Sequence, residues 1–359
     1  MGAGKTVVVA MSGGVDSSVA AALLKEAGYN VIGVFMRNWG QAVNGICPWA
    51  EDQKDMRKVC DKLNIPSYTF NFEKEYYEKV VEYFFEEYAS GRTPNPDVMC
   101  NKEIKFDVFR RKAKELGGDY IATGHYARVI KDESSGLVHL YKGLDGEKDQ
   151  SYFLWLLGQE ELSDILFPVG EMTKQEVRKL AKKFGLPTAG KKDSQGICFI
   201  GLIKVRKFLK TRIDAKPGPV ALEDGSVIAQ HEGVYFYTIG QRLGVDRINW
   251  PDGDIPVLYV KDKILKTNTL VVSGDSSLYA CSLICDNIHW IAEKPKLPCN
   301  FEVAIRYGHK PRKALLASCG NGKIKVSFQE PQRAITPGQS AVFYNQDKLI
   351  GGGIISGSK

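Results

Sequence analysis

The sequence lacks any apolar run that approaches the roughly 20 residues needed to cross a bilayer, although the chain has 359 residues. It also lacks an apolar signal region and an Arg- and Ser-rich transit segment near its first residue. No internal repeat and no low-complexity segment is found. These absences exclude a solenoid and a membrane-spanning helix, and we expect a cytoplasmic protein with no membrane partner.

Paired cysteines are missing as well. The chain has eight cysteines but no CxxC pair, and a cytoplasmic chain of this length is not held by a disulfide framework. Cys281, Cys285 and His289 are spaced by four, which would align them on a helix. The segment "CSLICDNIHWI" instead alternates as a strand does. We therefore expect no metal site built from these residues.

The first part of the chain has almost no net charge, whereas the second part has an excess of positive charge. Residues 1–200 carry 27 Lys and Arg against 28 Asp and Glu, whereas residues 201–359 carry 22 against 14. The net charge of +7 therefore resides in the C-terminal part. Such an excess suits a polyanionic partner such as RNA, or is simply a basic, well-hydrated surface.

The first motif follows a buried strand. "TVVVAM" is a continuous apolar run, "SGGVDS" comes directly after it, and "SVAAALLKEAGY" has the pattern of a helix. Glycines in such a turn direct backbone N–H groups inward, and the helix N-terminus adds partial positive charge, so the turn is a phosphate nest. The order strand, SGGxDS, helix resembles the loop of the N-type ATP pyrophosphatases; the alternative is a serine-rich turn that caps a helix. The earlier "GAGKT" precedes the strand and is not a Walker A loop.

The rest of the chain predicts an α/β fold. Helices and strands alternate up to "YIATGHYA", read as one strand over residues 120–127, which indicates a doubly wound parallel sheet. Short strands and turn glycines then predict a small β-rich middle domain, and alternating strands after Cys281 predict a C-terminal β-barrel. We expect domains at residues 1–205, 206–275 and 276–359.

Two further stretches carry cysteines beside polar residues. In "GRTPNPDVMCNKEIKF", Pro94 and Pro96 stiffen an exposed loop, and a helix is expected to start at Cys100. A helix N-terminus near Lys102 lowers a thiol pKa and favours thiolate. In "KKDSQGICFIG", Cys198 has an apolar flank, so from the residues alone it is either a buried inert thiol or a reactive one.

Seven segments taken together resemble the tRNA-specific 2-thiouridylase family, in order along nearly the whole chain. They are "AMSGGVDSSVAA", "GRTPNPDVMCNKEIKF", "ATGHYAR", "KDQSYFLW", "DSQGICFI", "YTIGQRLG" and "GGGII". The resemblance implies that ATP adenylates the carbon-2 oxygen of a wobble uridine, and that sulfur then replaces this oxygen. It implies a tRNA substrate, Mg²⁺ beside ATP, and a sulfur-relay protein or cysteine desulfurase as donor. A monomer is expected.

The same resemblance assigns residues to roles. It makes Cys198 the persulfide carrier and Cys100 the partner thiol, which either helps release sulfide or closes a disulfide with Cys198. Asp16 is expected to orient metal or phosphate, or else to cap the helix. The residues expected to contact ATP are Ala10, Met11, Ser12, Gly13, Gly14, Val15, Asp16, Ser17, Met36 and Gly124. Those expected to contact tRNA are Asn95, Pro96 and Asp97 at the target base, and His125, Lys148, Asp149, Gln150, Arg306, Tyr307 and Gln339 elsewhere.

Two other functions stay open from the sequence. One is another adenylating ATP pyrophosphatase, such as an amidotransferase or a small-molecule ligase, which would not need two cysteines in these settings. The other is a non-catalytic RNA-binding protein on the same scaffold. The intact "SGGVDS" and both cysteine motifs speak against the second. In the thiolating enzyme too the barrel must hold RNA, and there Tyr307 and Phe328 either stack on exposed bases or pack in the barrel core.

Overall fold

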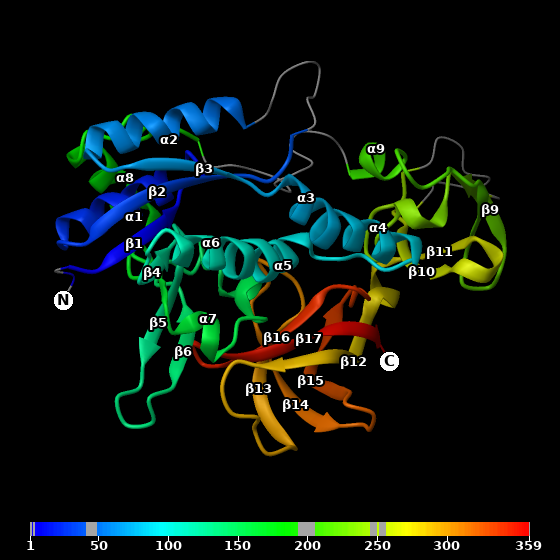
Figure 1. The fold of residues 1–359 in the computed structure, drawn as a ribbon. Coiled ribbons are helices and arrows are strands. Elements are labelled where there is room, and N and C mark those ends of the chain that lie inside the picture. The colour runs from blue at the N-terminus through cyan, green and yellow to red at the C-terminus, as the bar shows by residue number, and fades with distance from the viewer. Residues whose placement is uncertain are drawn as a thin grey trace.

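The computed structural model describes residues 2, 4–40, 49–192, 205–244, 250 and 256–358. Its first part is built on a parallel sheet with the strand order β3-β2-β1-β4-β7 (Figure 1). The strands of this sheet are β1 (Thr6–Ala10), β2 (Asn30–Arg37), β3 (Ser67–Asn71), β4 (Tyr120–Ala122) and β7 (Ile165–Leu166). The expected strand over residues 120–127 is wrong, because β4 ends at Ala122 and the chain turns before β5 begins at Ala127.

Both faces of the parallel sheet are covered by helices, as a doubly wound sheet requires. Val7 and Val9 of β1 pack into one buried cluster, together with α1 (Val15–Glu26), α2 (Ala50–Leu63) and α8 (Lys174–Lys183). Val8 packs into a second cluster on the opposite face. The apolar run of β1 is thus explained by burial on both sides, because successive side chains of a strand point to opposite faces.

The second face is covered by two long helical segments. The first consists of α3 (Glu73–Tyr76), the π-helix η1 (Tyr77–Val81) and α4 (Glu82–Ala89). The second consists of α5 (Pro96–Met99), the π-helix η2 (Cys100–Val108) and α6 (Phe109–Glu115). The first segment extends from the sheet toward the middle part of the chain (Figure 1). Shorter helices complete this part: η3 (Ser151–Leu154) and α7 (Gln159–Leu162).

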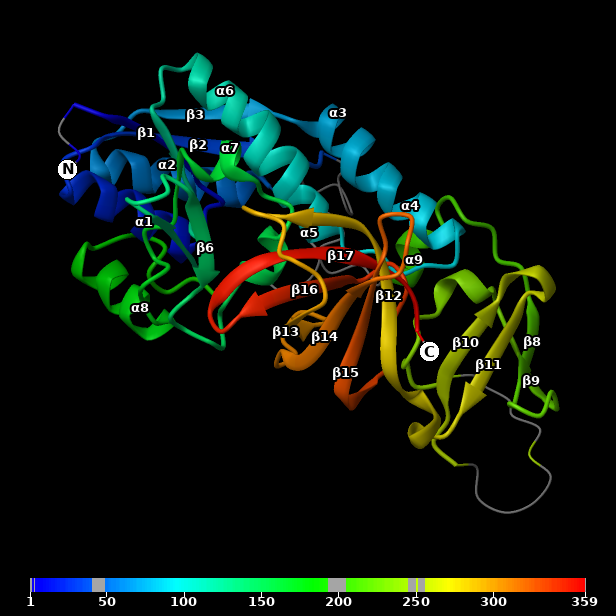
Figure 2. The same ribbon diagram turned by 90° about the horizontal axis from the view of Figure 1, so that it is seen from below.

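The middle part contains a four-stranded sheet with the order β10-β11-β8-β9 (Figure 2). Its strands are β8 (Gly218–Ala221), β9 (Val227–His231), β10 (Tyr259–Ile264) and β11 (Thr269–Ser273). Its helical turns are α9 (Val205–Leu209), η4 (Val234–Phe236), η5 (Leu265–Thr267) and η6 (Asp275–Leu278).

The C-terminal part is a closed barrel, since β12 pairs with both β15 and β17. Its strands are β12 (Tyr279–Trp290), β13 (Cys299–Ala304), β14 (Arg312–Ser318), β15 (Ile324–Arg333), β16 (Ser340–Asn345) and β17 (Lys348–Ser358). The hairpin β5 (Ala127–Lys131) and β6 (Val138–Lys142) extends this sheet, because Leu349 of β17 pairs with Leu140 of β6. The hairpin belongs to the first part of the chain, so main-chain hydrogen bonds join that part to the barrel.

The predicted fold class is confirmed: a parallel α/β sheet, a small β-rich part and a C-terminal barrel follow one another. The segment around Cys281 and Cys285 is a strand, as its alternation predicts. Within the described ranges, no helix combines the length and the apolar character that crossing a bilayer requires.

Candidate active site

The turn between β1 and α1 has the geometry of an anion nest. Gly14 is the N-cap of α1 and has no side chain that could bond the first-turn amides. Gly13 has a φ of +75°, and a Cβ there would lie 2.3 Å from the carbonyl oxygen of Asp52. The Oγ of Ser17 accepts a hydrogen bond from the N–H of Ser12 at 3.2 Å, which closes the turn. The open amides at the start of α1 therefore face a position that suits a phosphate group.

The carboxylate of Asp16 is held by two side chains that the sequence motifs do not include. The Nζ of Lys174 lies 2.7 Å from Oδ1 and 2.8 Å from Oδ2 of Asp16, and the hydroxyl of Tyr126 donates to Oδ1 at 2.8 Å. The alternative that Asp16 caps α1 is wrong, because Gly14 is the N-cap and Asp16 lies inside the first turn. Asp16 is thus a carboxylate oriented beside the phosphate nest.

Gly124, which is predicted to contact ATP, lies against the start of α1. A Cβ at Gly124 would lie 2.6 Å from the backbone nitrogen of Ser17, so no side chain fits there. Met36 is half-buried on β2 and packs against the cluster that contains Ala10. Met11 is 1 % exposed, which leaves its backbone rather than its side chain accessible.

An ion pair ties the segment that precedes Cys198 to the phosphate loop. The Nζ of Lys191 lies 2.6 Å from Oδ1 of Asp52 and 2.8 Å from Oδ2 of Asp55. The carbonyl of Asp52 is the group that Gly13 approaches. Cys198 itself lies outside the described residues, so its expected role stays a prediction.

The proline loop before Cys100 is mostly buried, and two expectations about it are wrong. Thr93, Pro94 and Pro96 are buried rather than exposed. The helix starts at Pro96, with the Oδ1 of Asn95 accepting from the N–H of Asp97 at 3.2 Å, so Cys100 is not the first residue of that helix. Cys100 is 4 % exposed, and Lys102, whose charge was expected to act on the thiol, pairs instead with Glu161 at 2.6 Å.

The barrel covers this proline loop through Gln339. The Nε2 of Gln339 donates to the carbonyl oxygens of Thr93 at 2.9 Å and of Pro94 at 3.1 Å. Gly338 has a φ of +93°, and a Cβ there would lie 2.8 Å from the backbone of Thr93. Gln339 is thus placed beside the segment that contains Asn95 and Pro96, 245 positions away from Pro94 in the chain.

Asp97 and His125, predicted to contact different parts of a tRNA, both interact with Lys105. The Nζ of Lys105 is 3.4 Å from the Nε2 of His125. Burial raises the pKa of Asp97, and the charge of Lys105 partly opposes this rise. Burial and the charge of Lys105 hold the pKa of His125 well below its usual value. His125 is 7 % exposed, so a direct contact between its ring and RNA stays a prediction.

Three other predicted tRNA contacts line one cavity between the first part of the chain and the barrel. This cavity of about 370 Å³ is bordered by Asp149, Arg306 and Tyr307, and also by Lys142, Gly146, Glu147, Tyr152, Ala304, Gly308, His309, Lys310, Pro311 and Tyr344. Burial lowers the pKa of Arg306 and raises that of Asp149. The ring of Tyr307 stacks on Phe153 at a centroid distance of 4.4 Å, and Tyr307 is 42 % exposed.

The side chains of Asp149 and Gln150 accept hydrogen bonds from backbone N–H groups in and beside the turn that contains them. The Oε1 of Gln150 accepts from the N–H of Tyr126 at 3.1 Å, and Asp149 accepts from the N–H of Gly143 and of Ser151, each at 3.0 Å. Lys148 is half-buried in the same turn. Of the two aromatic candidates, Phe328 is 7 % exposed and packs in the barrel core, so its stacking on bases is excluded.

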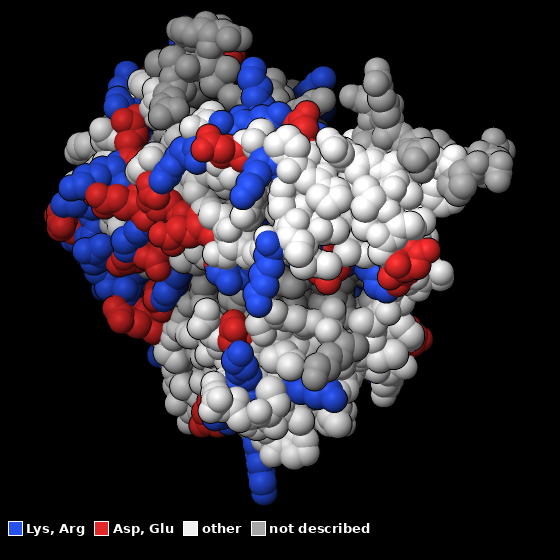
Figure 3. Space-filling model, turned by 90° about the vertical axis from the view of Figure 1, so that its right-hand side faces the viewer, with Lys and Arg blue, Asp and Glu red and all other residues white. Residues whose placement is uncertain are grey.

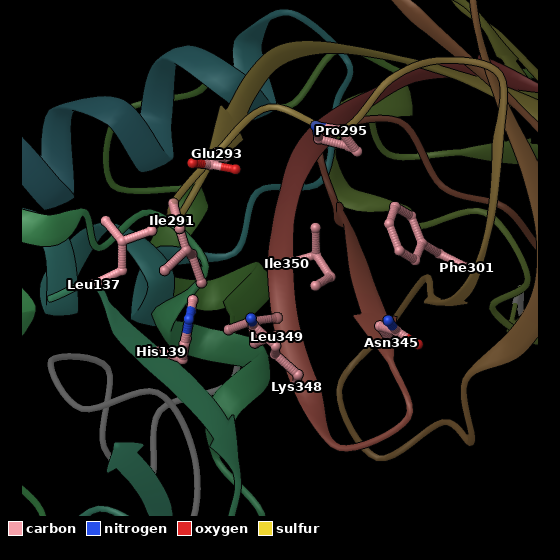
Figure 4. Close-up of a pocket in the computed structure, with 11 residues that line it drawn as sticks. Leu137, His139, Ile291, Glu293, Pro295, Phe301, Asn345, Lys348, Leu349 and Ile350 are labelled. Atoms are coloured by element: carbon pink, nitrogen blue, oxygen red, sulfur yellow. The ribbon is translucent and has the colours of Figure 1, made fainter. Parts of the chain in front are cut away.

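The charge excess of the C-terminal part does not form a surface of one sign on the face seen in Figure 3. Lys and Arg side chains are interspersed there with Asp and Glu, and a broad adjoining area carries few charges. A second cavity, of about 220 Å³, lies at the junction of β6, β13, β16 and β17 (Figure 4). Its lining, mainly apolar with His139 and Lys348, includes none of the predicted site residues.

The donor set around the phosphate loop fits a magnesium ion that is shared with phosphate groups. In the part of the chain that is described, no group of three or more His, Cys, Asp and Glu side chains gathers in a way that would hold a metal alone. Mg²⁺ is commonly bound by one or two carboxylates and by substrate phosphates, and keeps several waters. Asp16 supplies one carboxylate in the right place for such shared binding.

Known proteins resemble this chain over nearly its whole length. Residues 5–202 match the family described as a tRNA methyl transferase HUP domain, residues 206–274 the corresponding PRC-barrel domain, and residues 281–355 the aminomethyltransferase beta-barrel domain. Two relatives are each named tRNA-specific 2-thiouridylase MnmA. The protein from Enterococcus faecalis is 49 % identical over 97 % of this chain and 94 % of its own. That from Geobacillus thermodenitrificans is 48 % identical over the same shares.

Solved structures are more distant. A U34-tRNA thiolase, NcsA from Methanococcus maripaludis, is 20 % identical with a TM-score of 0.36, over 55 % of this chain and 62 % of that one. An NMN synthetase from Francisella tularensis is 19 % identical with a TM-score of 0.33, over 54 % and 67 %. Neither likeness bears on function. The near full-length relatives do bear on the family, and this chain belongs to the tRNA-specific 2-thiouridylase family.

Proposed function

We propose that this protein replaces the carbon-2 oxygen of a wobble uridine in tRNA with sulfur, in a reaction that cleaves ATP to AMP and pyrophosphate. The observation that carries the proposal is the connection between the phosphate nest and the helical segment that begins at the proline loop. Gly124 lies against the start of α1, and the next residue, His125, contacts Lys105 in the π-helix that directly follows Asn95 and Asp97. Relatives named as 2-thiouridylases, at nearly half identity over almost the whole chain, support it.

In the first step, the uridine oxygen attacks the α-phosphorus of ATP. The oxygen–phosphorus bond forms while the bond to the β-phosphate breaks, and pyrophosphate leaves. The first-turn amides of α1, with Ser12 and Ser17, bind the phosphates, and Gly124 lets the nucleotide approach. Asp16 would hold a magnesium ion together with the phosphates, which offsets the charge of the leaving pyrophosphate.

In the second step, the outer sulfur of a persulfide on Cys198 bonds to carbon 2, and the bond from carbon 2 to the adenylated oxygen breaks, so that AMP leaves. The thiolate of Cys100 attacks the inner sulfur of this persulfide, either before the transfer, so that hydrogen sulfide is released as the nucleophile, or after it. In both cases the sulfur–sulfur bond of the persulfide breaks and a disulfide between Cys100 and Cys198 forms, which an external thiol must reduce before the next cycle.

The ion pairs of Lys191 support this role of Cys198, because Lys191 contacts α2 next to Gly13 and the seven residues from Lys191 to Cys198 span at most about 25 Å. This length of chain is compatible with a thiol that acts at the phosphate loop.

The tRNA would lie across the junction of the first part and the barrel. Arg306, Tyr307 and Asp149 border the cavity there, and Lys148 and Gln150 flank Asp149 in the chain. Gln339 contacts the proline loop and His125 contacts Lys105, so both would lie on the side of the target base. A sulfur-relay protein or cysteine desulfurase would load Cys198. The division at residues 1–205, 206–275 and 276–359 and a cytoplasmic monomer belong to the same proposal.

The test is a reconstituted reaction with the full chain, ATP, Mg²⁺ and tRNA, in which a cysteine desulfurase with free cysteine supplies persulfide sulfur and a thiol reductant is present. We expect pyrophosphate release that depends on tRNA, and 2-thiouridine detected by mass. Cys198→Ala should keep pyrophosphate release and lose thiolation, whereas Asp16→Ala should lose both. Pyrophosphate release that depends on glutamine instead of tRNA would favour an amidotransferase, and tRNA binding without any release would refute the proposed activity.

A further inference from the structure

Lys105 is a half-buried cation whose neighbours do not neutralise it. It lies in the π-helix η2, and its Nζ contacts the Nε2 of His125 at 3.4 Å. Lys79 and Lys102, which lie in or against the same helix, each pair with a carboxylate at 2.6 Å. Among the described residues, no carboxylate lies within 4.0 Å of the Lys105 amine. Lys105 thus differs from these two lysines in having, within the described part of the chain, no ion pair that would account for its position, and its amine is available to an anionic ligand.

The acceptor of Lys105 is a neutral histidine with a fixed tautomer. The ring of His125 lies near Phe106 and Phe167, at centroid distances of 5.8 and 5.7 Å. Its Nδ1 lies 2.6 Å from the Oγ1 of Thr123. Because an ammonium group can only donate, Nε2 of His125 accepts, and Nδ1 carries the proton and donates to Thr123. His125 therefore orients the amine of Lys105 without cancelling its charge.

The position of Lys105 connects the two halves of the candidate active site. Its contact His125 follows Gly124, which lies against the backbone of Asp16 and Ser17 at the start of α1. Lys105 itself lies in the π-helix that directly continues α5, the short helix that contains Asp97, and its charge acts on the Asp97 carboxyl. The nest at α1 would take the outer phosphates of ATP. The α-phosphate must lie between these outer phosphates and a target base beside Asp97. We therefore expect it to lie close to the amine of Lys105.

We propose that Lys105 is a catalytic residue of the adenylation step, and this rests on the proposed function. When the uridine oxygen bonds to the α-phosphorus and the bond to the β-phosphate breaks, negative charge gathers on the α-phosphate oxygens. The ammonium of Lys105 donates to one of these oxygens and stabilises that charge. It neither gives up nor takes a proton, and the electron pair of the broken bond leaves with pyrophosphate. His125 is a positioning residue that acts through Lys105.

The experiment measures pyrophosphate release in a single turnover, with the full chain, tRNA, ATP and Mg²⁺ and with no sulfur source. For Lys105→Met we expect the rate to fall about 100-fold, as for the loss of one donor to a transition-state oxygen. The affinity for ATP should change less than about threefold, because the outer phosphates bind elsewhere. Lys105→Arg should recover part of the rate. Lys102→Met, in the same helix, should keep the rate of the unmodified protein.

A second measurement uses the two diastereomers of ATP with sulfur on the α-phosphate. In one diastereomer, sulfur replaces the oxygen that Lys105 contacts. This diastereomer should slow pyrophosphate release in the unmodified protein more than the other diastereomer does. In Lys105→Gln, the difference in rate between the two diastereomers should become smaller. Wild-type rates in Lys105→Met, equal losses of ATP affinity and rate, or an unchanged diastereomer preference would each overturn the role of Lys105. If the unmodified protein released no pyrophosphate with tRNA, the proposed function itself would fail.

Discussion

Lys174 holds both carboxylate oxygens of Asp16, at 2.7 and 2.8 Å, although the two residues are 158 positions apart. The side chain of Lys174 is 11 % exposed and that of Asp16 is 30 % exposed. Lys174→Met would remove both Lys174 contacts of this partly buried carboxylate and keep the hydrogen bond from the Tyr126 hydroxyl to Oδ1. We expect a loss of about 1–3 kcal/mol in the free energy of unfolding, measured in urea.

The control for this prediction is Lys182→Met on the same helix, where the side chain is exposed. It should change stability by less than about 0.5 kcal/mol. Asp16→Asn combined with Lys174→Met should cost less than the sum of the two single changes, because each removes the same interaction. Additive effects would show that the ion pair does not contribute to stability.

Gly124→Ala tests the close approach of β4 to the phosphate loop. The new Cβ would meet the backbone nitrogen of Ser17 at 2.6 Å, so the start of α1 must move. We expect ATP affinity to fall at least about tenfold, which corresponds to roughly 1.4 kcal/mol, measured by equilibrium dialysis. Gly357→Ala, where a Cβ meets nothing within 4 Å, should bind ATP normally. Equal affinities in both variants would argue against a nucleotide site at this turn.

Local sequence patterns predicted the elements better than the contacts between them. The apolar run of β1 and the glycine turn before α1 are visible within about 20 residues of sequence, and both lie where expected. The burial of the proline loop was not predicted, because Gln339 covers it from the far end of the chain. The addition of β6 to the barrel depends on a pairing of Leu140 with Leu349, which leaves no local signal.

The site residues missed from the sequence have a similar explanation. Thr173 and Glu176 form a capping box, so the sequence could have placed Lys174 in the first turn of a helix. Nothing near Lys174 indicates that Asp16 is its partner. Lys105 lies inside the quoted motif "CNKEIKF". Its contact with His125, and the lack of an ion pair with any carboxylate among the described residues, depend on packing between distant segments and cannot be predicted from the motif.

Gln339→Ala tests whether the barrel fixes the proline loop. It removes two hydrogen bonds to the carbonyls of Thr93 and Pro94, each contributing about 0.5–1.5 kcal/mol. We expect faster amide hydrogen exchange in peptides that cover residues 93–104, measured by mass spectrometry. Gln332→Ala, whose side chain donates only to Glu330 nearby, should leave that exchange unchanged. Protection of the loop in both variants would show that other contacts suffice to hold it.

His125 predicts a dependence of stability on pH. Burial and the charge of Lys105 lower the pKa of His125 below its unfolded value of about 6.5. A lowered pKa means that the contribution to stability is present above the unfolded pKa and is lost as the pH falls toward the folded pKa. We expect unfolding in urea to become easier below about pH 6.5, by up to about 1.4 kcal/mol per pH unit.

His125→Gln removes this titration and should flatten the stability profile between pH 6.5 and 5. The comparison is made against the unmodified protein at each pH, since other groups titrate in the same range. A variant with the same slope as the unmodified protein would place the acid sensitivity elsewhere in the molecule.

We expect exposed cysteines to react with an alkylating agent faster than buried ones. Burial raises the pKa of Cys60 and of Cys285 to about 12, so both stay protonated and covered at pH 8. Cys281 and Cys319 are exposed. Brief treatment with iodoacetamide, followed by peptide mass mapping, should modify Cys281 and Cys319 and leave Cys60 and Cys285 intact.

Cys100, at 4 % exposure, should be modified slowly while the barrel covers the proline loop, and faster in Gln339→Ala. Rapid modification of Cys100 in the unmodified protein would mean that the loop opens without any loss of the Gln339 contacts.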